Sequence, residues 1–246
     1  MQCRPFAQHF QLIPFEQATY DSRDVPGLEI AVSCRPYGRV GGDLFDYFPL
    51  ENESPVKRWC TFIGDASGRG LAAALVMADV QRILRNYGPQ FWGPADLLQH
   101  LNRSLCRLPL KGFVTAFLGI YETSTRRFRY ACAGHPPPLL KVNADGNVSR
   151  LDAVTNYPIG IDACEAFDEA RVYIFPGDTL LLYTDGVTED RNPKDEMFSE
   201  ERLRLILGKS DRPPAELVQH IERTLVAFRQ GRQREDDQAV VVVTGL

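Results

Sequence analysis

The sequence predicts an α+β fold made mostly of antiparallel sheet. Strand-like apolar segments follow one another through short polar turns, so hairpins replace the repeated strand-helix-strand units of a parallel sheet. Helical apolar spacing is confined to a stretch around Val76 to Tyr87, one that begins near Pro94, and one from about Pro213 to Arg229. The chain has no internal repeat and no low-complexity tract. A single layered domain accounts for this order of elements.

Composition fits one globular domain with a short leading segment. The chain has 246 residues, of which 44% are hydrophobic and 24% charged, and this length allows one sizeable core. We expect an N-terminal docking or linker segment over residues 1–20, where Pro5 and Pro14 interrupt the apolar residues, and one domain over residues 21–246. The apolar stretch Phe6 to Phe15 suits a docking helix, or a helix that couples the domain to an upstream module or a second copy.

Charge and cysteine content exclude several classes of protein. The net charge of −4 argues against a general nucleic-acid binder, which needs a basic face. No apolar run approaches the roughly 18 residues of a membrane span, and the first residues lack a signal-peptide core. The six cysteines are scattered without a C-x-x-C pair, which favours a reduced, cytoplasmic protein.

The strands and helices are expected in a definite order. A strand from Glu29 to Cys34 and another from Trp59 to Ile63 precede the first two helices, which should lie side by side on a sheet. Two hairpins and a last strand are then predicted: Phe113–Tyr121 with Phe128–Ala133, Arg171–Phe175 with Thr179–Thr184 around Pro176-Gly177-Asp178, and Val240–Val243. We expect the helix from Pro213 to cover a sheet through its apolar face.

Four aspartates share one context, beside a glycine or a second acid where an apolar strand starts or stops. They are Asp43, Asp65, Asp185 and Asp236. Strand ends at one edge of a sandwich converge, and two unit charges about 4 Å apart repel by about 4 kcal/mol at an effective dielectric near 20. Gathering these groups therefore requires cations or protonation. Carboxylate and carbonyl oxygens suit Mg²⁺ or Mn²⁺, and no cysteine or histidine lies in the same turns to favour Zn²⁺.

Other interpretations of these residues are weaker. An aspartate beside a glycine is often only a turn residue, although four repeats at strand ends disfavour that for the set. Gly68-Arg69-Gly70-Leu71-Ala72-Ala73 matches a dinucleotide fingerprint, but no second parallel strand with a terminal acid follows it. The C-x₅-R loop, the G-x-S-x-G elbow and the P-loop are absent. A water activated by two cations is the remaining scheme.

Five motifs in order resemble those of the metal-dependent protein phosphatases, in particular the bacterial SpoIIE/RsbU type that is related to the type 2C serine/threonine phosphatases. They are Val40-Gly-Gly-Asp43-Leu-Phe-Asp46, Ile63-Gly-Asp65-Ala-Ser-Gly68-Arg-Gly70, Ala133-Gly-His135-Pro, Tyr183-Thr-Asp185-Gly-Val187-Thr-Glu189 and Glu235-Asp236-Asp237-Gln. The resemblance runs from about Leu12 to Val243. It implies an α-β-β-α sandwich of two antiparallel sheets flanked by helices, with a binuclear Mg²⁺ or Mn²⁺ centre at one edge.

The resemblance also assigns residues to that centre. Asp43, Asp65, Asp185 and Asp236 match its metal ligands, and Ala66 matches the position that offers a backbone carbonyl. Further candidates, ranked below these, are Asp237, Gly64, Arg69 and His135. Arg69 stands where many members have histidine and Ala239 where threonine is common, so local contacts differ there. For Arg69 the choice is a phosphate contact or a surface residue without a role, and for His135 a structural or a catalytic residue.

The resemblance implies hydrolysis of phosphoserine or phosphothreonine in a signalling protein, with an anti-sigma-factor antagonist as the expected phosphorylated partner. An upstream sensor or receiver module and a homodimer are compatible with it. The alternative is a metal-binding or scaffold module of the same fold with little activity. Because all four ligand positions are acidic, the enzyme is favoured.

Overall fold

The computed structural model describes residues 18–20, 26–50, 57–108 and 112–246. The predicted docking segment over residues 1–20 lies outside this part of the chain, apart from a three-residue strand at Ala18–Tyr20. Within the described ranges no helix combines the length and the apolar character that crossing a membrane requires. The five described cysteines form no disulfide with one another.

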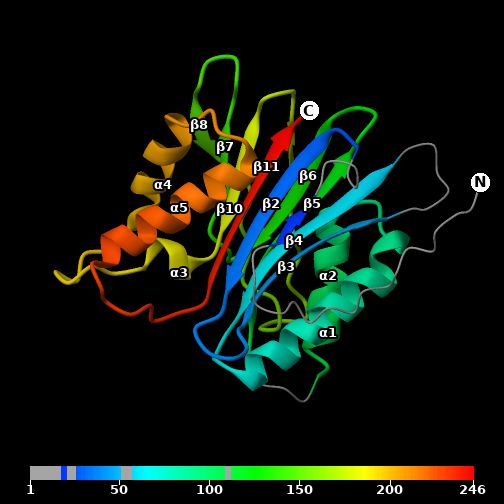
Figure 1. The fold of residues 1–246 in the computed structure, drawn as a ribbon. Helices are drawn as coiled ribbons and strands as arrows, with labels where there is room; N and C mark the ends of the chain where they lie inside the picture. The colour runs from blue at the N-terminus through cyan, green and yellow to red at the C-terminus, as the bar shows by residue number, and fades with distance from the viewer. Residues whose placement is uncertain (1–17, 21–25, 51–56, 109–111) are drawn as a thin grey trace, which may run out of the picture.

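Two antiparallel sheets lie face to face with helices on their outer surfaces (Figure 1). The six-stranded sheet, here called the β11 sheet, has the order β1 (Ala18–Tyr20), β2 (Leu28–Arg35), β11 (Gln238–Gly245), β10 (Thr179–Tyr183), β7 (Leu139–Lys141) and β8 (Val148–Arg150). The five-stranded sheet, here called the β4 sheet, has the order β3 (Asp43–Pro49), β4 (Arg58–Ala66), β5 (Val114–Glu122), β6 (Arg127–Ala133) and β9 (Ala170–Tyr173).

Helices cover the outer face of each sheet. The chain forms α1 (Leu71–Tyr87), the short η1 (Gly88–Gln90), α2 (Pro94–Leu105), α3 (Asp185–Thr188), α4 (Ser199–Gly208) and α5 (Pro214–Arg229). Leucines of α2 and apolar residues of α1 bury against the β4 sheet, whereas α4 and α5 bury theirs against the β11 sheet. A third apolar cluster fills the space between the sheets, where Phe117 and Val241 are fully buried. These layers confirm the predicted α-β-β-α sandwich and exclude the parallel sheet of a dinucleotide fold.

The predicted hairpins had different outcomes. β5 and β6 pair as expected, with Phe117 opposite Cys132. The predicted pairing of Arg171–Phe175 with Thr179–Thr184 was wrong. Instead, β9 pairs with β6 in the β4 sheet, and β10 pairs with β11 and β7 in the β11 sheet. The turn between them crosses from one sheet to the other. Asp178 holds this turn, since its buried carboxylate accepts the N–H of Phe175 at 2.8 Å and of Asn143 at 2.9 Å.

The helices also differ from the prediction in detail. Tyr87 was expected on the buried face of α1 but is 39% exposed, and the buried positions include Ala73 and Met77 instead. α4 was not predicted, because only Leu203 and Leu207 of its ten residues are buried and the apolar spacing is correspondingly weak. The short strand β8 was also missed.

Candidate metal centre

Asp43 and Asp65 face each other across neighbouring strands. Asp43 begins β3, Asp65 is near the end of β4, and the antiparallel register places them directly opposite. Both are half-buried, and the two carboxyl groups are within hydrogen-bonding reach. Opposed residues of an antiparallel pair have Cα atoms about 4.5–5.5 Å apart, so the sheet itself forces the two charges together.

Gly42 leaves room beside this pair. A Cβ at that position would lie 3.0 Å from the carbonyl oxygen of Ala66 and 3.1 Å from Oδ1 of Asp65. The Ala66 N–H donates to the Gly42 carbonyl at 3.1 Å, which fixes the two segments to each other. Because glycine supplies no side chain here, the Ala66 carbonyl and the Asp65 carboxylate border the same small space.

Asp185 and Asp236 come from the β11 sheet. Asp185 is the first residue of α3, directly after β10 and Thr184, and Asp236 precedes β11. Both are exposed. In Figure 1, α3 and the turn between β2 and β3 lie at the same end of the sandwich. The end of one sheet therefore meets the Asp43–Asp65 edge of the other.

Thr184 joins the two sheets at this edge. Its fully buried hydroxyl donates to Asp43 Oδ2 at 2.7 Å and accepts the Ala239 N–H at 2.9 Å. Its own N–H donates to the Ala239 carbonyl at 3.1 Å. Thr184 is thus held by β11 and orients a carboxylate on β3. Its role was not predicted, and its signal in the sequence is a hydroxyl residue between an apolar strand and Asp185.

The carboxylates repel one another. Burial raises the pKa of Asp43 well above its ordinary value, and the charge of Asp65 adds to this, whereas the Thr184 hydroxyl acts in the opposite direction. Burial, followed by the charges of Asp185, Asp236 and Asp237, raises the pKa of Asp65 to about 7. Burial and Asp236 raise the pKa of Asp185 as well. Negative charge from both sheets is therefore concentrated at this edge.

The fit of these groups to cations rests on their donor chemistry and on the space at Gly42. Oxygen donors of this kind suit Mg²⁺ or Mn²⁺, and a bound cation would relieve the repulsion among the carboxylates, which favours binding. In the described residues no group of three or more His, Cys, Asp or Glu side chains is already spaced to enclose a metal ion. Mg²⁺ keeps several waters and is typically bound through one or two carboxylates, so paired carboxylates are sufficient.

Asp237 has a different surrounding from Asp236. Its buried carboxylate accepts the backbone N–H of Tyr37 through Oδ1 and of Gly42 through Oδ2, both at 2.6 Å. A Cβ on Gly41 would lie 2.7 Å from this carboxylate, which explains a glycine there. Asp237 therefore holds the loop that leads into β3, and both of its oxygens are occupied.

The three remaining candidates, Gly64, His135 and Arg69, have surroundings that differ from those of the four aspartates. Gly64 lies within β4, where a Cβ would be 2.6 Å from the Thr115 carbonyl oxygen, so its smallness serves packing against β5. His135 is buried, with Nδ1 3.0 Å from the Thr115 hydroxyl, and burial lowers the pKa of His135 to about 3. Exposed Arg69 lies 3.3 Å from Asp236 Oδ2. These contacts give His135 a neutral, packed role and place Arg69 at the edge of the centre.

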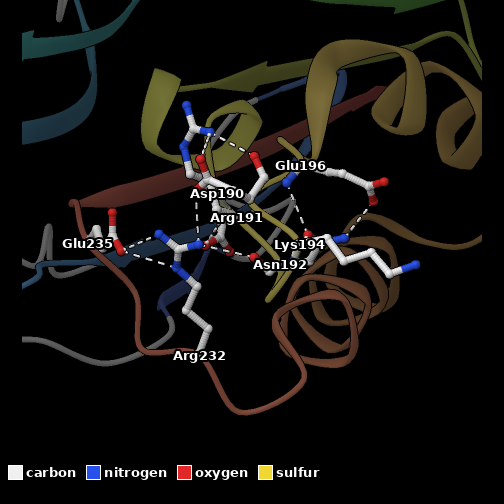
Figure 2. A network of polar contacts seen from close by, with 8 residues as sticks. Asp190, Arg191, Asn192, Lys194, Glu196, Arg232 and Glu235 are labelled. Atoms are coloured by element: carbon white, nitrogen blue, oxygen red, sulfur yellow. Dashed lines mark hydrogen bonds and ion pairs between the residues drawn. The ribbon is translucent and has the colours of Figure 1, made fainter.

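A polar network lies next to Asp185 and was not foreseen. Figure 2 shows Arg232 reaching across to Glu235 and to the segment from Asp190 to Glu196 that follows α3. Arg232 Nη1 donates to the Asn192 carbonyl at 3.0 Å, and its Nη2 lies 2.7 Å from Glu235 Oε1. The Asn192 side chain also accepts the N–H of Lys194 and Glu196, both at 3.0 Å. The segment beyond Asp185 is thus tied to the loop that carries Asp236.

Comparison with known proteins identifies the family. A family model described as stage II sporulation protein E (SpoIIE) matches residues 55–245. The chain belongs to the SpoIIE family. The chain is similar to the phosphoserine phosphatase RsbP of Bacillus subtilis, 26% identical over 83% of this chain, and to the phosphoserine phosphatase RsbU of the same organism, 25% identical over 88%. Protein IcfG of Synechocystis sp. is 26% identical over 89% of this chain.

The chain spans 38%, 49% and 63% of the lengths of IcfG, RsbP and RsbU. Solved structures confirm the SpoIIE-type fold. The PP2C domain of SiaA from Pseudomonas aeruginosa matches with a TM-score of 0.74 at 21% identity, covering 87% of this chain and 84% of that one. The RsbU and RsbW domains of Rv1364c from Mycobacterium tuberculosis match with a TM-score of 0.73 at 23% identity, covering 94% and 62%. At these identities the likeness concerns the fold.

Proposed function

We propose that the chain is a protein serine/threonine phosphatase that depends on two Mg²⁺ or Mn²⁺ ions. The observation that carries this proposal is the concentration of carboxylates from both sheets at one edge, where Asp43 and Asp65 are opposed in register and Asp185 and Asp236 raise the pKa of Asp65. Relatives named phosphoserine phosphatases support the same reaction class. A related structure, RsbX in complex with magnesium, has the same fold with a TM-score of 0.68.

In this proposal Asp43, Asp65, Asp185, Asp236 and the Ala66 carbonyl hold the ions. Bound there, two divalent cations would supply Lewis acidity and lower the pKa of a water enough for it to attack phosphorus. The protein's own part is orientation: Thr184 fixes the Asp43 carboxylate, and Gly42 keeps the space beside Asp65 and Ala66 open. Asp237 contributes by holding the loop before Asp43 and is not counted as a ligand.

We further propose that the substrate is a phosphorylated anti-sigma-factor antagonist, as the family membership and the relatives RsbP and RsbU suggest. Control by a sensor or receiver module, and a dimer, belong to the same proposal. The alternative function is a scaffold of this fold that binds metal without turnover. The acidic side chains at all four positions argue against a scaffold that has lost metal binding, because such a scaffold is under no constraint to keep them, and turnover then separates the enzyme from a metal-binding scaffold.

Hydrolysis of para-nitrophenyl phosphate with Mn²⁺, with Mg²⁺ and with a chelator tests the reaction. We expect release of nitrophenol with either metal and none with the chelator, and restoration when metal is returned. Loss of phosphate from candidate antagonist proteins, followed by mass, then tests the substrate. Turnover that survives chelation contradicts the metal mechanism, whereas tight metal binding without turnover on any substrate supports the scaffold.

A further inference from the structure

A concave surface of about 1080 Å³ lies beside the loops of the metal centre and is lined by four arginines. Arg35 is the last residue of β2, Arg229 is the last of α5, and Arg232 and Arg234 follow in the segment before β11. None of the described residues that line this cavity is acidic. The whole chain carries a net charge of −4, so this concentration of guanidinium groups is a local feature of the surface. We call it the arginine groove.

The carboxylates around the groove neutralise its arginines unevenly. Arg35 Nε lies 2.7 Å from Glu222 Oε1, and Arg232 pairs with Asp195 at 3.0 Å and with Glu235 at 2.7 Å. Arg229 Nη1 lies 3.3 Å from Asp190 Oδ2, yet neither atom makes a hydrogen bond in the part of the chain that is described.

Arg234 is the least neutralised of the four. Its Nη2 donates to the Pro36 carbonyl, while its buried Nε has no hydrogen-bond partner and the group forms no ion pair with any described carboxylate. Arg234 lines the groove together with Arg35 and Arg229. A buried donor and three guanidinium groups that repel one another favour an anion in the groove.

The groove shares a wall with the metal centre. A smaller pocket of about 140 Å³ is lined by Asp236 and Arg69, and Arg232 and Gln233 line both this pocket and the groove. The network in Figure 2 holds Arg232 in place through Glu235 and Asn192. A polypeptide with one residue at Asp236 therefore has the arginine groove within the reach of a few residues, at about 3.3 Å of extended chain per residue.

We propose that the arginine groove binds an acidic segment of the phosphoprotein substrate while its phosphorylated residue lies at the metal centre. The inference deepens the proposed function and rests on it. Arginine is the cation best suited to carboxylates, because its planar fork donates in pairs. The volume exceeds what one phosphate ion fills, and Val226, 55% exposed, gives the groove an apolar patch for a peptide stem.

Direct binding tests this without relying on catalysis. The probe is a fluorescein-labelled octaglutamate peptide, whose anisotropy is titrated with the metal-loaded full chain. We expect Arg35→Glu and Val226→Asp to weaken binding by about tenfold or more, because each places a negative charge in the groove. Val226→Asp keeps all four arginines and their ion pairs, so weaker binding by this variant reports the added negative charge. Circular dichroism checks that both variants are folded. The control Arg82→Glu changes an equally exposed arginine on α1 and leaves the affinity unchanged.

Equal affinity of Arg35→Glu, Val226→Asp and the Arg82→Glu control in this titration would overturn the proposed binding of acidic segments in the groove. Two further measurements distinguish the other outcomes. Displacement of the peptide by inorganic phosphate at matching concentration would show a phosphate site and overturn the acidic-segment proposal. A phosphoserine peptide with an acidic flank should show a raised KM with Arg35→Glu and a smaller change in kcat. If no form hydrolyses any phosphate ester, the phosphatase fails, while the octaglutamate titration still decides the groove.

Discussion

The β4 sheet and the β11 sheet contribute to the candidate centre in different ways. Asp43 and Asp65 lie within paired strands, are half-buried, and face each other because the register requires it. Asp185 and Asp236 lie just beyond strand ends, are exposed, and reach the centre through a short helix and a loop. The comparison indicates that one half of the centre is fixed by backbone pairing, whereas the other depends on side chains such as Thr184 that tie the sheets together.

The largest expected effect is loss of turnover when either half loses a carboxylate. Asp65→Asn and Asp185→Asn should each reduce the rate by at least about 100-fold, because each removes a charge from a proposed ligand and almost no volume. Steady-state hydrolysis of para-nitrophenyl phosphate at saturating Mn²⁺ measures this. Asp79→Asn is the control, since that aspartate pairs with Arg82 on the surface of α1. Near wild-type turnover of either variant would remove that residue from the centre.

Thr184→Val tests the connection between the halves. The substitution keeps the side-chain volume but removes the hydroxyl that holds Asp43 and accepts the Ala239 N–H. We expect metal affinity to fall by about 10- to 100-fold, as for other groups that orient a ligand, measured by calorimetric titration. Thr179→Val at the other end of β10, which loses only a contact with Thr244, should keep its affinity. Equal affinities would mean that the halves meet without this bridge.

Asp237→Asn tests the loop before Asp43. The two N–H groups of Tyr37 and Gly42 bond to different carboxylate oxygens, and in the amide an NH₂ donor replaces one of these oxygens, so one N–H group loses its acceptor. We expect the free energy of unfolding to fall by about 1–3 kcal/mol, measured by urea denaturation with chelator present. The neighbouring Asp236→Asn should cost less under the same conditions, since its side chain is 51% exposed and an exposed ion pair such as the one with Arg69 contributes little. A matching loss in both variants would contradict the separation of roles.

A further effect concerns the dependence of stability on pH in the absence of metal. The pKa of Asp65 is raised to about 7, whereas the unfolded value is about 4. Between these values the folded state holds a proton that the unfolded state has released, so stability decreases as pH rises from about 4 to 7. The unfolding free energy of the wild type minus that of Asp65→Asn should therefore decrease as pH rises from about 4 to 7. A flat difference would show that Asp65 titrates normally and that the β4 half carries no excess charge.

Local patterns predicted the strands and the acidic turns well, because both depend on residues close together in sequence. The family's fold followed from five motifs in order, and Asp43 and Asp65 were both expected at strand ends, whereas their direct pairing across β3 and β4 came from the structure. The change of sheet at Pro176-Gly177-Asp178 could not be predicted, because a proline-glycine turn between two apolar stretches looks the same in a hairpin. What decides it is the contact of Asp178 with distant Asn143.

The contacts of single side chains were likewise beyond the sequence. Asp236 and Asp237 are adjacent and chemically identical, yet one is exposed and the other has both oxygens bonded to a loop some 195 residues earlier in the chain. The residues from Gln230 to Glu235 form a polar run in the sequence, and only the fold brings Arg232 and Arg234 next to Arg35 and Arg229. Long-range placement, which composition does not encode, assigns these roles.

The central position of β11 has a consequence for how the protein acquires its centre during synthesis. This strand comes after every other described element and is inserted between β2, near the start, and β10. Residues up to Gly245 must therefore leave the ribosome before the sheet can close, and β2, which pairs with β1 on one side, waits for a second partner more than two hundred residues away. Until then Thr184 lacks the Ala239 N–H, and Asp236 has no fixed location. Folding of this kind, dominated by distant pairings, is slow, and the proposed centre is incomplete until β11 docks.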